Sequence, residues 1–229
     1  MEQEELNKII AKHVKWLQGK GGKRADLSRV DLSRVNLSGV NLSYAYLYGA
    51  DLSYANLNEA DLRYAKLNKA DLHGTNLCYT NLHGADLIHA VLRDAKLCHA
   101  ELCHANLHGA ELHGVNLHGA ELCYANLRGV ELCHANLRGA ELEAAILPIG
   151  VYQIVGAGSC NRCTTYDTIN DQVVCGCWDD GAGNKLNSFA KRIKEIYGPN
   201  GEEPNSMYYA EYMAAITFFK AMKKLNKKT

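Results

Sequence analysis

The chain has 229 residues, 47% of them hydrophobic, and its 25 basic side chains are balanced by 25 acidic ones. This balance excludes both the basic excess typical of a nucleic-acid-binding domain and a strongly acidic chain. No stretch approaches the roughly 18 consecutive apolar residues of a membrane span, and the start, MEQEE, does not resemble a signal peptide. Nine cysteines, an odd number, favour a reducing compartment, so we expect a cytoplasmic protein.

Residues 1–24 are predicted to form an amphipathic helix followed by a glycine-rich turn. Glutamates gather at the start of residues 2–18, where the helix dipole favours them. The apolar side chains at helical spacing are those of Leu6, Ile9, Ile10, His13, Val14 and Leu17. Gly19, Gly21 and Gly22 then break the helix. We interpret this segment as a cap over the exposed edge of the repeat that follows, with a partner-binding helix as the alternative.

Residues 25–149 repeat the pattern A(D/N/E)Lxx without a break. Leu occupies every fifth position from Leu27 to Leu147, 25 leucines in all, and Ala, Val or Thr stands two residues before each. A period of five fits neither a helix, at about 3.6, nor a strand, at about 2, so each repeat is interpreted as one side of a four-sided coil. Leu and the small residue should point inward. The pattern argues against a disordered tract, because so many regularly spaced leucines would leave too much apolar surface in water.

The repeat resembles the pentapeptide repeat proteins, and the resemblance implies an all-β solenoid, a right-handed quadrilateral β-helix. At 20 residues per coil, about six coils stacked at about 4.8 Å would make a rod of about 30 Å. The position two residues after Leu is Gly in nine repeats and larger elsewhere. A type II turn needs a positive φ there. We therefore predict mixed turn types, with type II favoured at the glycines.

Charged residues of the repeat sort by face when residues 20 apart are stacked. The repeat carries fourteen acidic and nine basic side chains, and two opposite faces are acidic. The candidate interaction residues are Asp31, Asp51, Asp71, Glu111 and Glu131 on one face, and Asp61, Glu101, Glu121 and Glu141 on the other. A third face carries an asparagine column, interrupted by Lys96: Asn36, Asn56, Asn76, Asn116 and Asn136. The amides of this column are expected to hydrogen-bond from coil to coil.

Residues 150–229 differ in composition and predict a small α+β module. Residues 151–178 are predicted to form a strand and then a β-hairpin that turns near Asn170-Asp171, and helices are predicted at 185–197 and 206–225. The arrangement resembles a terminal module of some bacterial and phage-encoded pentapeptide repeat proteins, and this resemblance implies no activity. We predict that the module covers the last coil and forms a homodimer, since its aromatic surface exceeds what one small module needs.

Two sets of cysteine and histidine side chains are candidate metal ligands. Cys160, Cys163, Cys175 and Cys177 could form a tetrahedral zinc site, and buried reduced thiols are the alternative. Along the coil, Cys78, Cys98 and His118 share a column, as do His83, Cys103 and Cys123. The outer members of a column lie nearly 10 Å apart, about two coil spacings, which is too far for one ion to bond both.

The sequence predicts a protein without enzymatic activity or cofactor. It contains no nucleophile elbow, phosphate-binding glycine loop or HExxH motif. The leading interpretation is a rigid structural or protein-interaction scaffold, with no direct contact to nucleic acid or membrane. The alternative comes from the family, because some pentapeptide repeat proteins mimic DNA, bind gyrase and other type II topoisomerases, and confer quinolone resistance. Duplex DNA carries about 18 charges over 30 Å, far more than the small acidic excess of this repeat.

Overall fold

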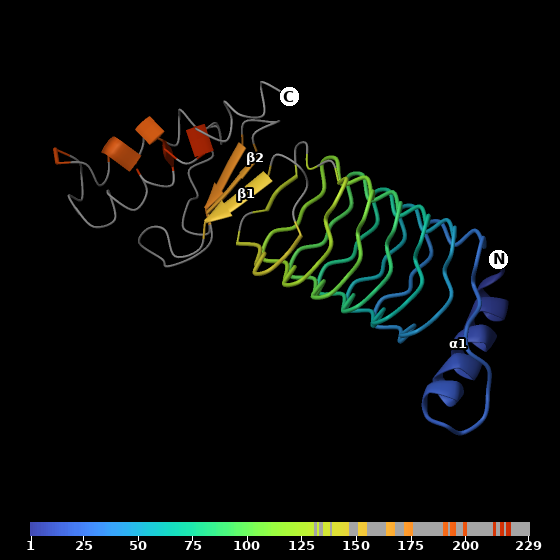
Figure 1. Cartoon of the computed structure of the whole chain (residues 1–229). Coiled ribbons are helices and arrows are strands. Elements are labelled where there is room, and N and C mark those ends of the chain that lie inside the picture. Colours follow the sequence, from blue (N-terminus) through green and yellow to red (C-terminus); the bar gives the residue numbers. More distant parts are fainter. Residues whose placement is uncertain are drawn as a thin grey trace. The chain divides into compact units, whose positions relative to one another are not determined.

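The computed structural model describes residues 1–130, 132, 135–137, 139–146, 190–191, 193–195, 199–200, 213, 216–217 and 219–220, and the backbone of 151–154, 164–167 and 172–175. The chain divides into two compact units, Met1–Pro148 and Ile149–Thr229. Helix α1 and the repeat belong to the first unit, and a small sheet belongs to the second (Figure 1).

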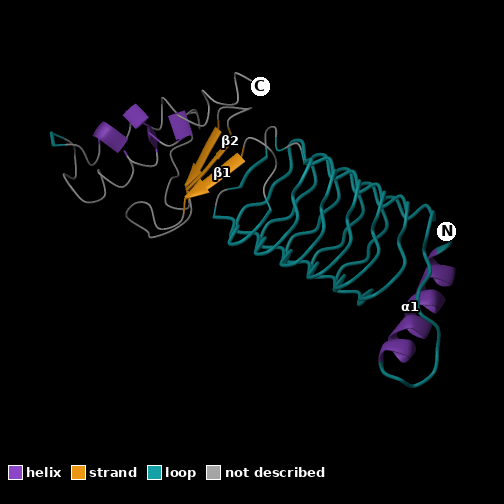
Figure 2. Ribbon diagram, in the orientation of Figure 1, coloured by secondary structure: helices purple, strands orange, loops and turns teal. Residues whose placement is uncertain are grey.

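Helix α1 spans Gln3–Leu17 and is drawn in purple in Figure 2. Its first turn is acidic, with Glu4 and Glu5, and its last turn contains Lys15, as the helix dipole favours. The chain leaves the helix through glycines with positive φ. At Gly22, where φ is 90°, an added Cβ would lie 2.2 Å from the Lys12 carbonyl oxygen, so only glycine fits. The predicted helix and its glycine-rich end are confirmed.

The repeat forms a stack of coils, each of 20 residues. Parallel bridges join residues 20 apart, among them Asp51 to Asp71 and Glu101 to Glu121. Each side is hydrogen-bonded to both neighbouring coils: the backbone N–H of Asp86 donates to the Ala65 oxygen at 3.0 Å, and that of Leu87 donates to the Asn106 oxygen at 2.8 Å. The predicted β-helix is confirmed.

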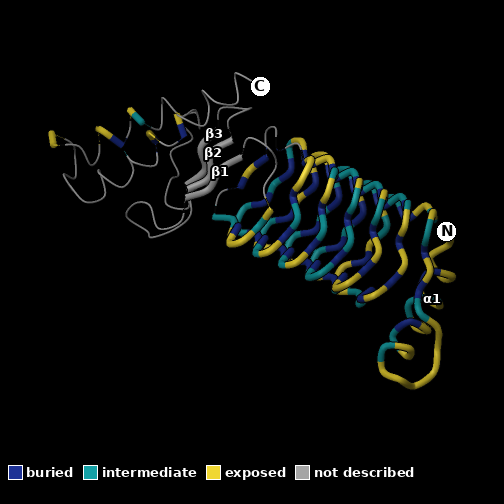
Figure 3. Tube along the Cα trace, viewed as in Figure 1, coloured by how far each residue is buried: buried dark blue, intermediate teal, exposed yellow. Residues whose placement is uncertain are grey.

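The interior of the coil is filled by leucine and small residues. Every repeat leucine from Leu27 to Leu127 is at most 1% exposed, and buried residues recur on each coil in Figure 3. Thr75 and Thr80 are buried as well, and their hydroxyls donate to the Leu52 and Leu57 carbonyl oxygens at 2.7 Å. The inward positions are therefore those predicted. Val30, Val35 and Val40 are only half-buried, because the first coil has a neighbouring coil on one side only.

The corners of the coil share one backbone conformation. At every described corner the second residue after Leu has a positive φ, from 53° at Ala144 to 68° at Gly129, and Tyr79 at 58° does not differ from the glycines. The prediction of mixed turn types is wrong. The reason is that each corner is bonded to the next coil, as in the 2.9 Å bond from Tyr79 N–H to the Cys98 oxygen. A different turn would break this register, so the fold accepts a strain of about 1–2 kcal/mol at a non-glycine corner.

The second unit contains a three-stranded antiparallel sheet in the order β1, β2, β3. Its strands are β1 (Val151–Ile154), β2 (Thr164–Asp167) and β3 (Gln172–Cys175), and β2 pairs with β3 from Thr164↔Cys175 to Asp167↔Gln172. The expected strand corresponds to β1 and the expected hairpin to β2 and β3. The loop containing Asn170 and Asp171 and most of the two expected helices lie outside the described residues. No described helix has the length and apolar character needed to cross a membrane.

Candidate functional site

The first residue of most sides closes the corner that follows it. The Asp51 carboxylate accepts the backbone N–H of Ser53 at 2.9 Å, and the Asn76 amide oxygen accepts that of Cys78 at 3.3 Å. Such Asx turns explain why Asp and Asn recur at this position. This role was not predicted from the sequence, although the preference for Asp and Asn at this position was its signal. Where Glu replaces Asp, as at Glu101 and Glu121, the longer side chain is exposed on the surface.

The first acidic face is interrupted by an apolar residue and contains an ion pair. Asp31, Asp51 and Asp71 lie in one column, and Val91 separates them from Glu111. Hydrogen bonds from the side chain and backbone of Ser33 lower the pKa of Asp31, and Glu111 is paired with Arg93 at 2.6 Å. Glu131 lies outside the described residues. On this face, therefore, hydrogen bonds stabilise the Asp31 carboxylate and an ion pair neutralises Glu111.

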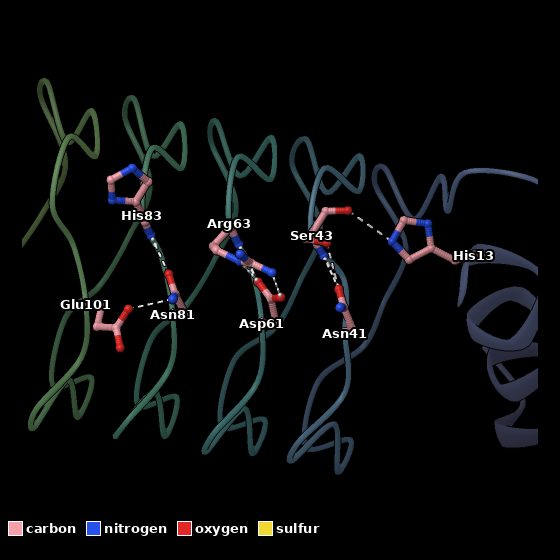
Figure 4. Close-up of polar contacts among 8 residues, drawn as sticks. All are labelled: His13, Asn41, Ser43, Asp61, Arg63, Asn81, His83 and Glu101. Carbon is pink, nitrogen blue, oxygen red and sulfur yellow. Dashed lines mark hydrogen bonds and ion pairs between the residues drawn. The ribbon is translucent and has the colours of Figure 1, made fainter. Parts of the chain in front are cut away.

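The second acidic face keeps a run of exposed carboxylates. Asp61, partly neutralised by Arg63 at 2.6 Å, shares its column with Asn81, whose side-chain amide donates to Glu101 at 2.5 Å (Figure 4). Partial burial raises the pKa of Asp61, but the hydrogen bonds and charge of Arg63 lower it by more. Beyond them Glu101, Glu121 and Glu141 stand on successive coils and are all exposed. The structure thus brings together three of the four residues predicted on this face as one column of like charges.

The predicted asparagine column is present. The Asn56 amide donates to Asn36 and that of Asn76 to Asn56, both at 3.2 Å, and Asn136 donates to Asn116 at 3.0 Å. Lys96 interrupts the column between Asn76 and Asn116, as expected. A second ladder, from Asn126 to Asn106 at 3.0 Å, was not predicted. These bonds fix the coil register on two faces.

A row of aromatic rings follows one corner of the coil. The centroid distances are 5.1 Å for Tyr44–Tyr64, 5.6 Å for Tyr64–His83, 5.2 Å for His83–His104 and 5.0 Å for His104–Tyr124. The stacking of these rings was not predicted from the sequence. The missed signal was the recurrence of Tyr or His about 20 residues apart at one corner. We call this row the ring ladder, and it is a candidate contact surface.

His13 is buried and hydrogen-bonds α1 to the coil. Its Nδ1 lies 3.1 Å from the backbone nitrogen of Ala25, and its Nε2 lies 3.1 Å from the Ser43 carbonyl oxygen (Figure 4). Because an N–H only donates and a carbonyl only accepts, the ring is neutral with its proton on Nε2. Burial is the main cause that lowers the pKa of His13. The Ser43 hydrogen bond opposes this shift, and the charge of Arg24 adds to it.

We expect acidification to destabilise the wild-type protein more than a His13→Gln variant. An unfolded histidine binds a proton near pH 6.5, whereas the folded pKa of His13 is lower. The stability contribution is therefore complete above about pH 6.5 and is lost as pH falls through the folded pKa. Glutamine offers a donor and an acceptor without titrating. Thermal melts followed by circular dichroism at about pH 7.5 and about pH 5 measure the difference, and an equal Tm shift in both proteins would contradict it.

The predicted zinc ligands cannot be placed. Cys160, Cys163, Cys177 and the side chain of Cys175 lie outside the described residues. Within the described part of the chain, no group of three or more His, Cys, Asp or Glu side chains is arranged to hold a metal ion. The cysteines of the two coil columns occur there as neighbouring pairs, described below.

A four-sided coil with a leucine interior and outward columns of residues defines a repeat protein of the β-helix class. Eight copies of the sequence profile described as "Pentapeptide repeats" match residues 23–53, 55–94, 85–122 and 110–147. The chain belongs to the pentapeptide repeat family.

Solved structures of other pentapeptide repeat proteins are similar to this chain. One, from the Arabidopsis thaliana thylakoid lumen, is 30% identical to this chain, with a TM-score of 0.39. The match covers 40% of this chain and 63% of the Arabidopsis protein, which is less than two thirds of that relative. Rfr23 from the cyanobacterium Cyanothece 51142 is 28% identical over 60% of this chain and 97% of its own, with a TM-score of 0.31. Trypsin-treated QnrB1, a plasmid-mediated fluoroquinolone resistance protein, is 18% identical over 52% and 80%, with a TM-score of 0.23. The search of curated proteins found no match.

Proposed function

We propose that this protein is a non-enzymatic scaffold that binds another macromolecule through the outer faces of its β-helix. The proposal rests on two features of the coil. Leucine fills its interior, and hydrogen bonds between coils hold its outward side chains in columns. Side chains on neighbouring coils are fixed about 4.8 Å apart. A partner would meet a preorganised surface, and little ordering free energy would oppose binding. The described repeat cysteines are free thiols, which suits a cytoplasmic location.

One surface of the coil supports this function best. The column of Glu101, Glu121 and Glu141 precedes the corner that carries His104 and Tyr124 of the ring ladder. Carboxylates pair with Arg and Lys, and an exposed Tyr ring such as that of Tyr124 attracts the same cations through its face. We call these five residues the acidic–aromatic surface. Its chemistry favours a basic segment of a partner protein.

Replacing the three glutamates tests this surface. We expect a Glu101→Gln/Glu121→Gln/Glu141→Gln variant to lose partners that the immobilised wild-type protein retains from a lysate of the source organism. The matched control is Asp31→Asn/Asp51→Asn/Asp71→Asn on the opposite face, because asparagine preserves the Asx turns. Mass spectrometry identifies the retained proteins. If both variants retain the same set as the wild type, neither acidic face binds a partner.

Topoisomerase inhibition is the alternative, supported by the family and the acidic faces. We expect no inhibition of gyrase supercoiling at micromolar protein, because the acidic excess of the repeat is small, and Arg63 and Arg93 pair with a carboxylate on each acidic face. A DNA mimic would act through charge, which is screened over about 8 Å at physiological salt, so its inhibition would weaken as salt rises. Potent, salt-sensitive inhibition that the triple Gln variant loses would replace the scaffold proposal with DNA mimicry.

We also propose that residues 150–229 form a homodimer. The support comes from the sequence, where the helix predicted at 206–225 carries an apolar stripe that includes Tyr209, Tyr212 and Met213. Light scattering should give twice the chain mass for the full-length protein and the single mass for a chain ending at Leu147. A full-length monomer would refute the dimer, and a dimer of the shortened chain would move the contact to the coil.

A further inference from the structure

Two pairs of cysteines lie on consecutive coils at equivalent corner positions. They are Cys78 with Cys98, and Cys103 with Cys123, and all four thiols are free and partly buried. The Tyr79 N–H donates to the Cys98 oxygen and the His104 N–H to the Cys123 oxygen, both at 2.9 Å. These bonds join the two coils of each pair directly beside the thiols. Each pair therefore consists of two thiols held one coil apart by the backbone.

The two thiols of each pair interact with one another. Burial is the largest cause that raises the pKa of Cys98 and of Cys103, and the neighbouring thiol, Cys78 or Cys123, raises it further. Cys103 Sγ additionally lies 3.9 Å from a carboxylate oxygen of Glu121. The two thiols of each pair therefore affect each other's ionisation, and the coil register places them on adjacent coils.

The coil spacing fits an ion between the sulfurs better than a bond between them. Side chains on neighbouring coils are about 4.8 Å apart at their Cβ atoms, whereas a disulfide prefers a Cβ–Cβ distance of about 3.5–4.5 Å. Side chains that leave neighbouring coils in parallel keep their sulfurs about one coil spacing apart, and two metal–sulfur bonds of about the Zn–S length of 2.3 Å span about 4.6 Å. A zinc site would need about four ligands, and no third His, Cys, Asp or Glu among the described residues completes one. Thiolate pairs suit soft ions, of which Cu(I) accepts two ligands.

We propose that Cys78 with Cys98, and Cys103 with Cys123, are two separate two-coordinate sites for a soft monovalent ion of the Cu(I) class. On binding, each thiol releases its proton to solvent and its sulfur forms one bond to the ion. The oxidation state of copper and sulfur does not change. The rod thus carries two such sites at two different corners, independently of its role as a scaffold.

A competition titration with Cu(I) tests the pairing. The full chain is titrated without oxygen against the coloured Cu(I) complex of bicinchoninate, and the loss of colour measures the ions transferred. Two double variants are compared with the wild type: Cys78→Ser/Cys98→Ser removes one whole pair, and Cys78→Ser/Cys103→Ser removes one thiol from each pair. The other five cysteines of the chain are common to all three proteins, so their uptake cancels.

The two double variants should differ although each lacks two thiols. The same-pair variant should bind one ion fewer than the wild type, and the split-pair variant two fewer. If both variants lose the same number of bound ions, single cysteines bind copper adventitiously. If neither variant loses any, the pairs bind no copper. Either result overturns the proposal. The proposal is also wrong if oxidised glutathione closes the pairs to disulfides, seen as a loss of about two mass units per pair, while no copper is taken up. Circular dichroism melts confirm that the variants are folded.

Discussion

Leu87→Asp should abolish the cooperative melting of the β-helix. Leu87 is fully buried, and Leu67 and Leu107 occupy the same inward position on the coils to either side. A carboxylate at this position has neither water nor an inward cation, and an unpaired buried charge costs several kcal/mol even after its pKa rises. A loss of this size is a large part of the roughly 5–15 kcal/mol that stabilises a typical domain. Thermal unfolding followed by circular dichroism gives the measurement.

The control is the next residue along the chain. Ile88 is partly exposed at the corner, so Ile88→Asp should leave the melting temperature nearly unchanged. Both variants introduce the same charge one residue apart, and only the direction of the side chain differs. Equal damage from both would mean that the inward and outward positions are assigned wrongly.

Repetition explains why the interior could be predicted from the sequence. The requirement to bury apolar surface acts at every fifth residue, so no tertiary contact elsewhere in the chain can override the pattern. The asparagine column was predictable for a related reason. Asn36 and Asn56 lie 20 residues apart, and the coil length alone brings their amides within hydrogen-bond distance.

The corner conformation could not be predicted from individual residue preferences. Glycine favours positive φ and tyrosine does not, which is the basis of the mixed-turn prediction. At Tyr79, hydrogen bonds to the next coil override that preference. The ring ladder was missed for a different reason. One member, His83, occupies the first corner position and the others occupy the second, so their separation is not always 20 residues.

The small residue two positions before each leucine should be nearly as intolerant of change as the leucine itself. Ala90 is fully buried, with Ala70 and Ala110 on the coils to either side. Ala90→Leu adds three carbon atoms to an interior that already contains a leucine on every side. The backbone N–H of Ala90 donates to the Leu87 oxygen at 3.0 Å, and the Ala90 carbonyl oxygen accepts the N–H of Glu111. This side of the coil therefore cannot move outward without breaking its hydrogen bonds to Leu87 and Glu111.

Overpacking at such a site costs about 3 kcal/mol, which for a chain of this length lowers the Tm by about 10 °C. Ala144→Leu adds the same atoms at an exposed corner and should leave the Tm nearly unchanged. Differential scanning calorimetry compares the two variants with the wild type. If Ala90→Leu has the same Tm as the wild type, the coil can widen locally. The small residues would then not determine the distance between opposite sides of the coil. If it melts far below the wild type while Ala144→Leu does not, the alternation of Leu with a small residue fixes the coil width, and with it the spacing of the outward columns.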